Sequence, residues 1–351
     1  MTVVLVCRYL PPRLLDRIAA VDERIEVLHD PRLALPAVGR LGLLHLAEDR
    51  AESAEAAAPR PFGRDDEERW LALMGRAEVM FDVDPAYVDA IPERTPSLRW
   101  IQGIAAGAGE LFRSASLRES AVQVATARGV HDEPLADFAL MAVLAYNKRL
   151  DVLRVQQAER RWREIPHVPL AGRVMCVVGL GSIGAAVATR ARAFGMRVVG
   201  VRRTARPSEL AERVHPPEEI GAAVVDADYV VVTLPDTQET RALIDAGTIA
   251  AMKPGAYLVN VGRGTVVDED ALTEALRSGH LAGAALDVFA TEPLPAESPL
   301  WDLPNVIVSP HSTAVMPGTS IERMVDLLCT NLRRDLAGES LLHLADKSAA
   351  Y

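Results

Sequence analysis

The chain has 351 residues, of which 49% are hydrophobic and 25% are charged, and its formal net charge is −10. This length exceeds the size at which single hydrophobic cores usually stop growing, so two domains are expected. The negative charge argues against nucleic acid and anionic membranes as partners, because both demand a positive surface. Cys7, Cys176 and Cys329 form no CxxC pair, so neither a metal site nor a disulfide framework is predicted, and a reducing compartment fits.

The N-terminus, MTVVLVCRYLPP, runs straight into an apolar segment and lacks a basic region and a small-residue cleavage site. No signal peptide is therefore predicted. No apolar run approaches the ~20 residues needed to span a bilayer. We expect a cytoplasmic protein that acts on a small molecule.

Short apolar runs alternate with helical patterns along the chain, which is typical of parallel βαβ construction. In the first part, strands are expected at 2–7, 24–29, 77–82, 98–103 and 122–127. Residues 47–69 are polar and rich in alanine, which is typical of a solvated helix or loop, and no function is assigned to them.

Residues 133–150 are expected to form one helix, with Pro134 and acids near its start and Lys148 and Arg149 in its last turn. A second series of six strands is expected at 173–181, 196–203, 227–235, 256–264, 281–289 and 305–311. Six parallel strands with helices between them predict a doubly wound dinucleotide fold. The following helix, 319–338, is expected to pack on the first domain, which would make that domain discontinuous.

Gly179, Gly181 and Gly184 have the G-x-G-x-x-G spacing, between an apolar strand and an alanine-rich helix. The first glycine permits a tight turn, the second lets the backbone approach a pyrophosphate, and the third lets helix and strand pack closely. The amides near Ser182 and Ile183 are expected to hold the phosphates. The alternative is a structural turn without ligand, but the position between strand and helix favours a dinucleotide.

The end of the second strand of this series indicates which dinucleotide binds. NAD-specific folds carry an acid about 20 residues after the glycines, and it accepts hydrogen bonds from the ribose hydroxyls. Here Arg202, Arg203 and Thr204 occupy that region, and no acid occurs from 201 to 207. Guanidinium groups bind phosphate oxygens with forked contacts, so NADP(H) is predicted, with NAD(H) possible. A solvated basic turn is the alternative.

Isolated polar residues follow three late strands, at the place where doubly wound folds hold their sites. They are Arg263, then Asp287 and Glu292, and finally His311. Arg263 can hold a carboxylate and polarise a ketone with a forked contact. His311 can donate the proton that the developing oxyanion needs, because histidine titrates near neutral pH. Glu292 beside it would fix its orientation and favour its protonated form.

The order GLGSIG, LPDTQET, NVGRGTVVDEDAL, ALDVFATEPLP, SPHSTA resembles the D-isomer-specific 2-hydroxyacid dehydrogenases, in particular their glyoxylate/hydroxypyruvate reductases. The resemblance extends upstream to LRWIQGIAAGAGEL and ADFALMAVLAYNKRL, and covers roughly residues 75–330. It implies an α/β protein with a flavodoxin-like substrate domain, 1–130 and 313–351, into which a Rossmann domain, 131–312, is inserted. It also implies an active site in a cleft and a homodimer.

The resemblance assigns catalysis to Arg263, Glu292 and His311, and a contact with the nicotinamide carboxamide to Asp287. It places further cofactor contacts at Leu234, Pro235, Thr240, Val261 and Gly262. Ala106 and Gly107 are implied to offer backbone amides to the substrate carboxylate, with Arg263 and His311 completing the substrate site.

Two positions depart from or add to the family pattern. The usual A-G-V-D is Ala106-Gly107-Ala108-Gly109 in this chain, so the common Asp is missing. His131 could face the cleft, although a role at the start of the helix or on the surface is expected.

These features predict a reductase of small 2-oxo acids such as glyoxylate or hydroxypyruvate. Phosphoglycerate oxidation is disfavoured because that branch commonly carries a C-terminal regulatory domain, whereas 40 residues follow His311. Formate oxidation is disfavoured because those enzymes have Gln in place of Glu292, and phosphite oxidation stays open. A nucleotide-sensing co-repressor is the alternative outside enzymes, but no extra tail or docking feature is found.

Overall fold

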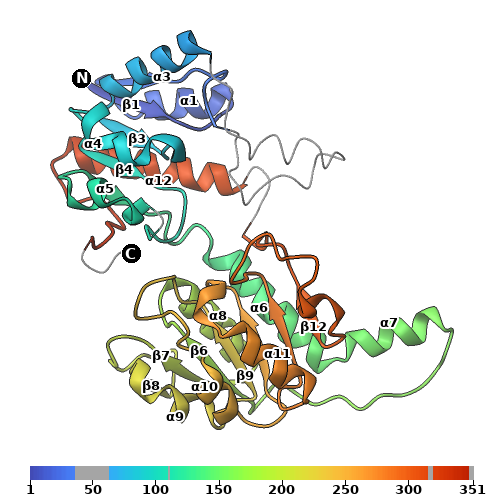
Figure 1. Cartoon of the computed structure of the whole chain (residues 1–351). Coiled ribbons are helices and arrows are strands. Elements are labelled where there is room, and N and C mark those ends of the chain that lie inside the picture. Colours follow the sequence, from blue (N-terminus) through green and yellow to red (C-terminus); the bar gives the residue numbers. More distant parts are fainter. Residues whose placement is uncertain (36–62, 110, 315–318, 348–351) are drawn as a thin grey trace. The chain divides into compact units, whose positions relative to one another are not determined.

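The computed structural model describes residues 1–35, 63–109, 111–314 and 319–347, and in them the chain forms two parallel sheets with helices on both faces (Figure 1). The chain divides into unit 1, Met1–His131 with Val315–Tyr351, and unit 2, Asp132–Ala314. The predicted fold class is confirmed.

Unit 1 contains the sheet β2-β1-β3-β4-β5, which has the flavodoxin-like strand order. Its strands are β1 (Thr2–Val6), β2 (Ile25–Leu28), β3 (Val79–Phe81), β4 (Trp100–Gln102) and β5 (Gln123–Ala125). Its α-helices are α1 (Pro12–Ala19), α3 (Arg64–Arg76), α4 (Ile91–Arg94), α5 (Ala115–Glu119) and α12 (Thr319–Leu336). Each strand is shorter than the expected run.

Two hydrophobic clusters cover the two faces of this sheet. On one face, α1 and α12 pack against alternate residues of β1 and β3 such as Val4, Val6 and Phe81. On the other face, α3, α4 and α5 pack against the intervening residues such as Leu5 and Met80. The alternation follows the two-residue period of a strand buried on both sides.

Unit 2 contains a seven-stranded parallel sheet, β12-β11-β10-β9-β6-β7-β8. Its strands are β6 (Val174–Val178), β7 (Arg197–Val201), β8 (Arg213–His215), β9 (Tyr229–Val232), β10 (Tyr257–Asn260), β11 (Gly283–Leu286) and β12 (Val306–Val308). The expectation of six strands was wrong, because β8 is a three-residue edge strand that contains only one apolar residue, Val214. The order reverses between β6 and β9, which is the topological switch point where such sheets bind ligands.

The helices of unit 2 divide between the two faces of its sheet. Its α-helices are α6 (Asp132–Asn147), α7 (Leu150–Ala158), α8 (Ser182–Ala193), α9 (Ile220–Val224), α10 (Ala246–Ala251) and α11 (Glu269–Arg277). Helices α6 and α8 pack on one face, and α9, α10 and α11 on the other. Short 3₁₀ turns occur at Pro85–Ala90, Leu111–Arg113, Pro217–Glu219, Gly264–Val266 and Pro299–Asp302.

The helix expected at 133–150 ends earlier. Arg149 has a left-handed backbone with φ of 52°, so α6 stops at Asn147 and a second helix, α7, begins at Leu150. Lys148 and Arg149 therefore lie in the junction rather than in a last turn. Helix α7 extends beyond the layers of unit 2 (Figure 1).

Two remaining expectations concern segments of the chain. Of the polar segment 47–69, residues 47–62 lie outside the described residues, and Arg64–Arg69 belong to α3. Among the helices of the described ranges, none is long and apolar enough to cross a membrane. Cys7, Cys176 and Cys329 are all buried.

Candidate active site

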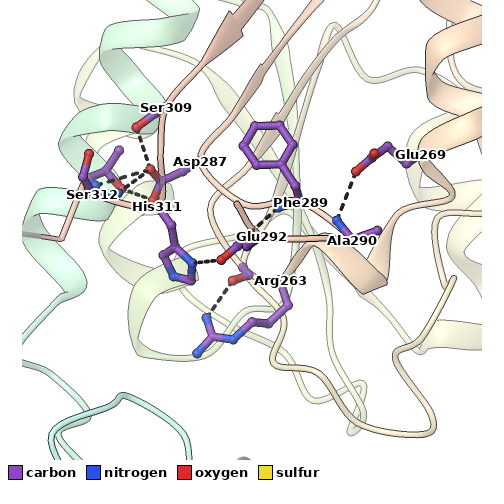
Figure 2. A network of polar contacts seen from close by, with 11 residues as sticks. Arg263, Glu269, Asp287, Phe289, Ala290, Glu292, Ser309, His311 and Ser312 are labelled. Carbon is purple, nitrogen blue, oxygen red and sulfur yellow. Dashed lines mark hydrogen bonds and ion pairs between the residues drawn. The ribbon is translucent and has the colours of Figure 1, made fainter. Parts of the chain in front are cut away.

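Arg263, Asp287 and His311 follow three neighbouring strands of unit 2, β10, β11 and β12, which are all parallel. The carboxyl ends of parallel strands meet at one edge of the sheet, so the three side chains gather there with Glu292 (Figure 2). The structure thus brings together every polar residue that the sequence marked after these strands.

His311 and Glu292 form a direct contact in this group. The imidazole Nδ1 of His311 lies 2.8 Å from Glu292 Oε2, and Glu292 Oε1 accepts a hydrogen bond of 3.0 Å from the amide of Phe289 (Figure 2). Burial raises the pKa of Glu292, but the hydrogen bonds from His311 and Phe289 and the charges of His311 and Arg263 outweigh it and hold that pKa below its usual value. Glu292 is therefore a carboxylate, so Nδ1 of His311 carries the hydrogen between them.

Asp287 holds the segment that carries His311. Its Oδ1 accepts hydrogen bonds from the Ser309 hydroxyl at 2.6 Å and the Ser312 amide at 3.0 Å, and its Oδ2 accepts from the Thr313 hydroxyl at 2.6 Å. The side chain is buried, and His311 has a φ of 53°, a left-handed conformation that costs energy for a residue other than glycine. Asp287 thus fixes a strained backbone.

Asn260 and Gly264 fix the loop that carries Arg263. The Asn260 side chain accepts a hydrogen bond from the Gly262 amide and donates one to the Arg263 carbonyl, both 3.0 Å long. A Cβ on Gly264 would lie 1.9 Å from the carbonyl carbon of Phe289. Only glycine therefore lets the Arg263 loop approach the Glu292 turn this closely. The guanidinium of Arg263 donates one hydrogen bond to the Gly262 carbonyl, 2.8 Å away.

The glycine turn lies at the switch point, and its residues fit a dinucleotide. Gly179 has a φ of 107°, and a Cβ on Gly184 would lie 2.1 Å from the Gly179 carbonyl oxygen, so both positions need glycine. Open space surrounds the Cβ position of Gly181, which caps α8 without a side chain and leaves the first amides of the helix available to an anion. Thr233, after β9, donates a 2.6 Å hydrogen bond to the Gly179 carbonyl and ties the turn across the switch point.

The turn after β7 is organised by Arg202. Its Nε donates to the Thr204 carbonyl at 2.8 Å and its Nη2 to the Arg206 carbonyl at 2.7 Å. Arg203 and Thr204 are exposed on this turn. The side chain of Arg202 therefore closes the loop on which the other two are carried.

The remaining expected cofactor residues lie at the ends of β9 and β10. The Thr240 hydroxyl donates to the Pro235 carbonyl at 2.6 Å and so braces the loop after β9. A Cβ on Gly262 would lie 2.5 Å from the Leu234 carbonyl oxygen, so the two loops touch, and Val261 beside Gly262 is buried. Their contact with a cofactor stays a prediction, as does that of Asp287.

The expected substrate residues Ala106 and Gly107 belong to unit 1, in the loop that follows β4. The amide of Gly103 donates to Ala125 and the amide of Ala127 donates to Ala105, each over 2.7 Å. Nothing lies within 4 Å of a Cβ built on Gly107, so the tip of the loop has space around it.

Several positioning residues escaped the sequence analysis: Thr233, Asn260, Ser309 and Thr313. Thr233, Asn260 and Ser309 are polar residues next to an apolar run at a strand end, and Thr313 lies a few residues beyond the end of β12. That signal could have been noticed, but it does not say which backbone group each side chain contacts. In the portions of the chain that the structure describes, no three His, Cys, Asp or Glu side chains are placed to hold a metal ion.

The parallel sheet with a glycine turn at its switch point, and the paired His311 and Glu292 beside it, define a dinucleotide-dependent enzyme. Comparison with known families agrees with this assignment. Residues 140–313 match the model described as "D-isomer specific 2-hydroxyacid dehydrogenase, NAD binding domain".

Relatives of known name extend this match. The chain is 36% identical to a glyoxylate/hydroxypyruvate reductase B from Pectobacterium carotovorum, over 70% of this chain and 78% of that protein. It is 34% identical to a D-3-phosphoglycerate dehydrogenase from Mycobacterium bovis, over 78% of this chain but 52% of that protein.

Among solved structures, a D-isomer specific 2-hydroxyacid dehydrogenase from Xanthobacter autotrophicus, in complex with NADPH and MES, superposes with a TM-score of 0.78. It is 28% identical in sequence, and the match covers 100% of this chain and 99% of that one. The chain belongs to the D-isomer-specific 2-hydroxyacid dehydrogenase family, and it is an NAD(P)-dependent oxidoreductase.

Proposed function

We propose that the protein reduces a small 2-oxo acid of the glyoxylate or hydroxypyruvate type to the D-2-hydroxy acid, with NADPH as the preferred cofactor. The observation that carries this proposal is the 2.8 Å contact of His311 with Glu292, at the strand ends that also hold Arg263. The similarity to a glyoxylate/hydroxypyruvate reductase supports the substrate class.

Arg263 is the residue proposed to hold the substrate. Of its five N–H groups one is spent on the Gly262 carbonyl, and the others can form a forked contact with the substrate carboxylate and polarise the ketone oxygen. Ala106 and Gly107 of unit 1 are proposed to offer amides to the same carboxylate. In this proposal 1–130 and 313–351 form the substrate domain, and 131–312 the dinucleotide domain.

His311 is the proposed acid/base. Because Nδ1 donates its hydrogen to Glu292, the proton that reaches the ketone oxygen comes from Nε2. A bound nicotinamide supplies the hydride. Glu292 keeps the ring oriented and balances its charge, and Asp287 holds the backbone of the histidine in place. In the oxidative direction Nε2 takes the hydroxyl proton.

The preference for NADPH rests on the turn after β7. Arg203 and Thr204 are exposed there, no acid occurs from 201 to 207, and Arg202 closes the turn. This turn would therefore offer cationic and hydroxyl donors to a 2′-phosphate and has no carboxylate of its own. The solved relative that contains NADPH supports this assignment. The proposed cofactor contacts are Gly179, Gly181, Ser182, Ile183, Gly184, Leu234, Pro235, Thr240, Val261, Gly262 and Asp287.

We propose further that the protein is a homodimer. Six of the twelve exposed large hydrophobic residues in the described chain lie between 141 and 168, on α6, α7 and the segment after them. Trp162 is fully exposed. We infer that these residues contribute to a protein–protein contact, because such contacts bury exposed apolar surface. Sedimentation of the unmodified protein and of Trp162→Ser measures their molecular masses and so tests this proposal. A monomeric mass for the unmodified protein would contradict the dimer. The cytoplasmic location stays a prediction.

The second candidate substrate is a phosphorylated 2-oxo acid, because the phosphoglycerate dehydrogenase relative is nearly as similar. One experiment separates the candidates. The initial rate is measured with glyoxylate, hydroxypyruvate, pyruvate and 3-phosphohydroxypyruvate, each with NADPH and with NADH. The proposal expects the highest kcat/KM for glyoxylate or hydroxypyruvate with NADPH, and a clear preference for the phosphorylated acid would replace it.

A further inference from the structure

The chain passes from unit 1 to unit 2 at the peptide bond between His131 and Asp132. Each of these two residues holds a loop of its own unit by a side-chain hydrogen bond. His131 contacts the loop after β4 at Ile104, and Asp132 contacts the glycine turn at Ser182.

His131 fixes the base of the loop that contains Ala106 and Gly107. Its Nε2 lies 3.1 Å from the Ile104 carbonyl oxygen. A carbonyl only accepts hydrogen bonds, so Nε2 carries the hydrogen. The residues on either side of Ile104 are held by backbone hydrogen bonds, so His131 completes the support of three consecutive residues.

Asp132 fixes the first residue of α8. The Ser182 hydroxyl donates to Asp132 Oδ1 over 3.1 Å. A serine hydroxyl has one hydrogen to donate, so this contact leaves the backbone amide of Ser182 as the donor for a phosphate. Helices α6 and α8 also pack together, and Arg190 Nε bonds Asp137 Oδ1 at 2.7 Å one turn further along α6.

We propose that His131 and Asp132 are positioning residues that couple the two binding loops. Adjacent Cα atoms lie about 3.8 Å apart across a rigid, planar peptide. Only the ψ of His131 and the φ of Asp132 separate the two anchored residues, so we infer that a displacement of the glycine turn reaches the carbonyl of Ile104 through this short path. A ligand that orders one loop lowers the cost of ordering the other, and the effect is reciprocal. The inference rests on the proposed roles of the two loops.

The test uses two ligands. Oxalate stands in for the substrate carboxylate, which the amides of Ala106 and Gly107 and the guanidinium of Arg263 are proposed to hold. ADP-ribose and its 2′-phosphate carry the pyrophosphate but lack the nicotinamide, and the tighter binder of the two is used. Calorimetry measures the Kd of oxalate with and without this fragment. In the unmodified protein the fragment is expected to tighten oxalate by about fivefold or more, the lower range of allosteric coupling.

Two pairs of variants separate positioning from general damage. His131→Phe and Asp132→Ala remove the contacts and should bring the ratio of the two Kd values to within about twofold of one. His131→Gln keeps an amide donor near the position of Nε2, and Asp132→Asn keeps an acceptor oxygen, so both should retain the coupling. Asp137→Ala, which removes the contact with Arg190 and leaves those of His131 and Asp132, is the matched control and should retain the coupling too.

The outcomes distinguish this inference from the proposed function. Turnover of 2-oxo acids together with full coupling in His131→Phe and Asp132→Ala would overturn the inference alone. Loss of coupling in those two variants, without turnover of any acid in the panel, would support the inference and overturn the reaction. Absence of coupling in the unmodified protein, or of oxalate binding, would also overturn the inference.

Discussion

Nδ1 of His311 lies 2.8 Å from Oε2 of Glu292, and the other oxygen of the same carboxylate is held by the Phe289 amide. The histidine ring is thus oriented by a group that is itself fixed. Its side chain is 20% exposed, so a ligand can reach the ring from outside the pair.

Replacing His311 should remove proton transfer and leave the cofactor site intact. General acid–base groups contribute about 10²- to 10⁴-fold, so His311→Ala is expected to lower kcat/KM for the best 2-oxo acid by that factor. The Kd of NADPH should change little. The exposed His167 provides the control, since His167→Ala removes a histidine far along the chain from the strand ends. A His311→Ala enzyme with the activity of His167→Ala would exclude His311 as the proton donor.

The lowered pKa of Glu292 predicts how acid affects stability. A carboxyl whose pKa is lower in the folded state stabilises the fold above its unfolded pKa, and the contribution disappears as the pH falls through the folded value. The usual value is 4.5. The excess stability of the unmodified protein over Glu292→Gln should therefore shrink as the pH falls below about 4.5. Urea unfolding in this acid range measures the excess, and an excess that grows as the pH falls below about 4.5 would contradict the assigned direction.

The position of the site could be predicted from the sequence because it follows from topology. Arg263, Asp287 and His311 each end an apolar run, and parallel strands bring such ends to one edge. The glycine turn could be predicted as well, because the backbone conformation or the close packing of this turn requires glycine at Gly179 and Gly184. The edge strand β8 gave no such signal, since one apolar residue in three has no periodicity to detect.

The directions of side chains could not be predicted in the same way. The cofactor contacts of Asp287 and Arg202 stay predictions, but the sequence does not show what else these side chains bind. The oxygens of Asp287 accept hydrogen bonds from the segment that carries His311. The guanidinium of Arg202 donates to two carbonyls of its own loop. Both choices depend on where neighbouring backbone groups lie after folding, which spacing in the sequence does not contain.

Gly264 should tolerate no side chain. A Cβ there would lie 1.9 Å from the carbonyl carbon and 2.1 Å from the carbonyl oxygen of Phe289, and backbone atoms cannot rotate away. Overpacking costs about 1–3 kcal/mol, so Gly264→Ala should lower the free energy of unfolding by at least that much. It should also lower kcat, because it pushes the Arg263 loop away from the Glu292 turn.

The matched control is Gly221 in α9, where a Cβ would meet nothing within 4 Å. Gly221→Ala should be neutral or stabilising by up to about 1 kcal/mol, since alanine is the better helix former. Chemical denaturation of both variants decides the matter. Equal stability of the two would show that the Arg263 loop can move away from Phe289 without cost.

Arg203 is expected to be the main contact for the 2′-phosphate, because it is exposed on the turn, whereas the half-buried Arg202 donates two hydrogen bonds to the Thr204 and Arg206 carbonyls. A hydrogen bond to a charged group contributes about 1.5–3 kcal/mol. Arg203→Ala should therefore weaken NADPH by about 10- to 150-fold and leave NADH unchanged. Arg213→Ala removes one positive charge from an exposed position in β8. It is the control for the effect of net charge on the affinity for NADPH. Fluorescence titration with both cofactors measures the four affinities. Equal loss in the two variants would assign the effect to net charge, and tighter binding of NADH than of NADPH by the unmodified protein would refute the predicted preference.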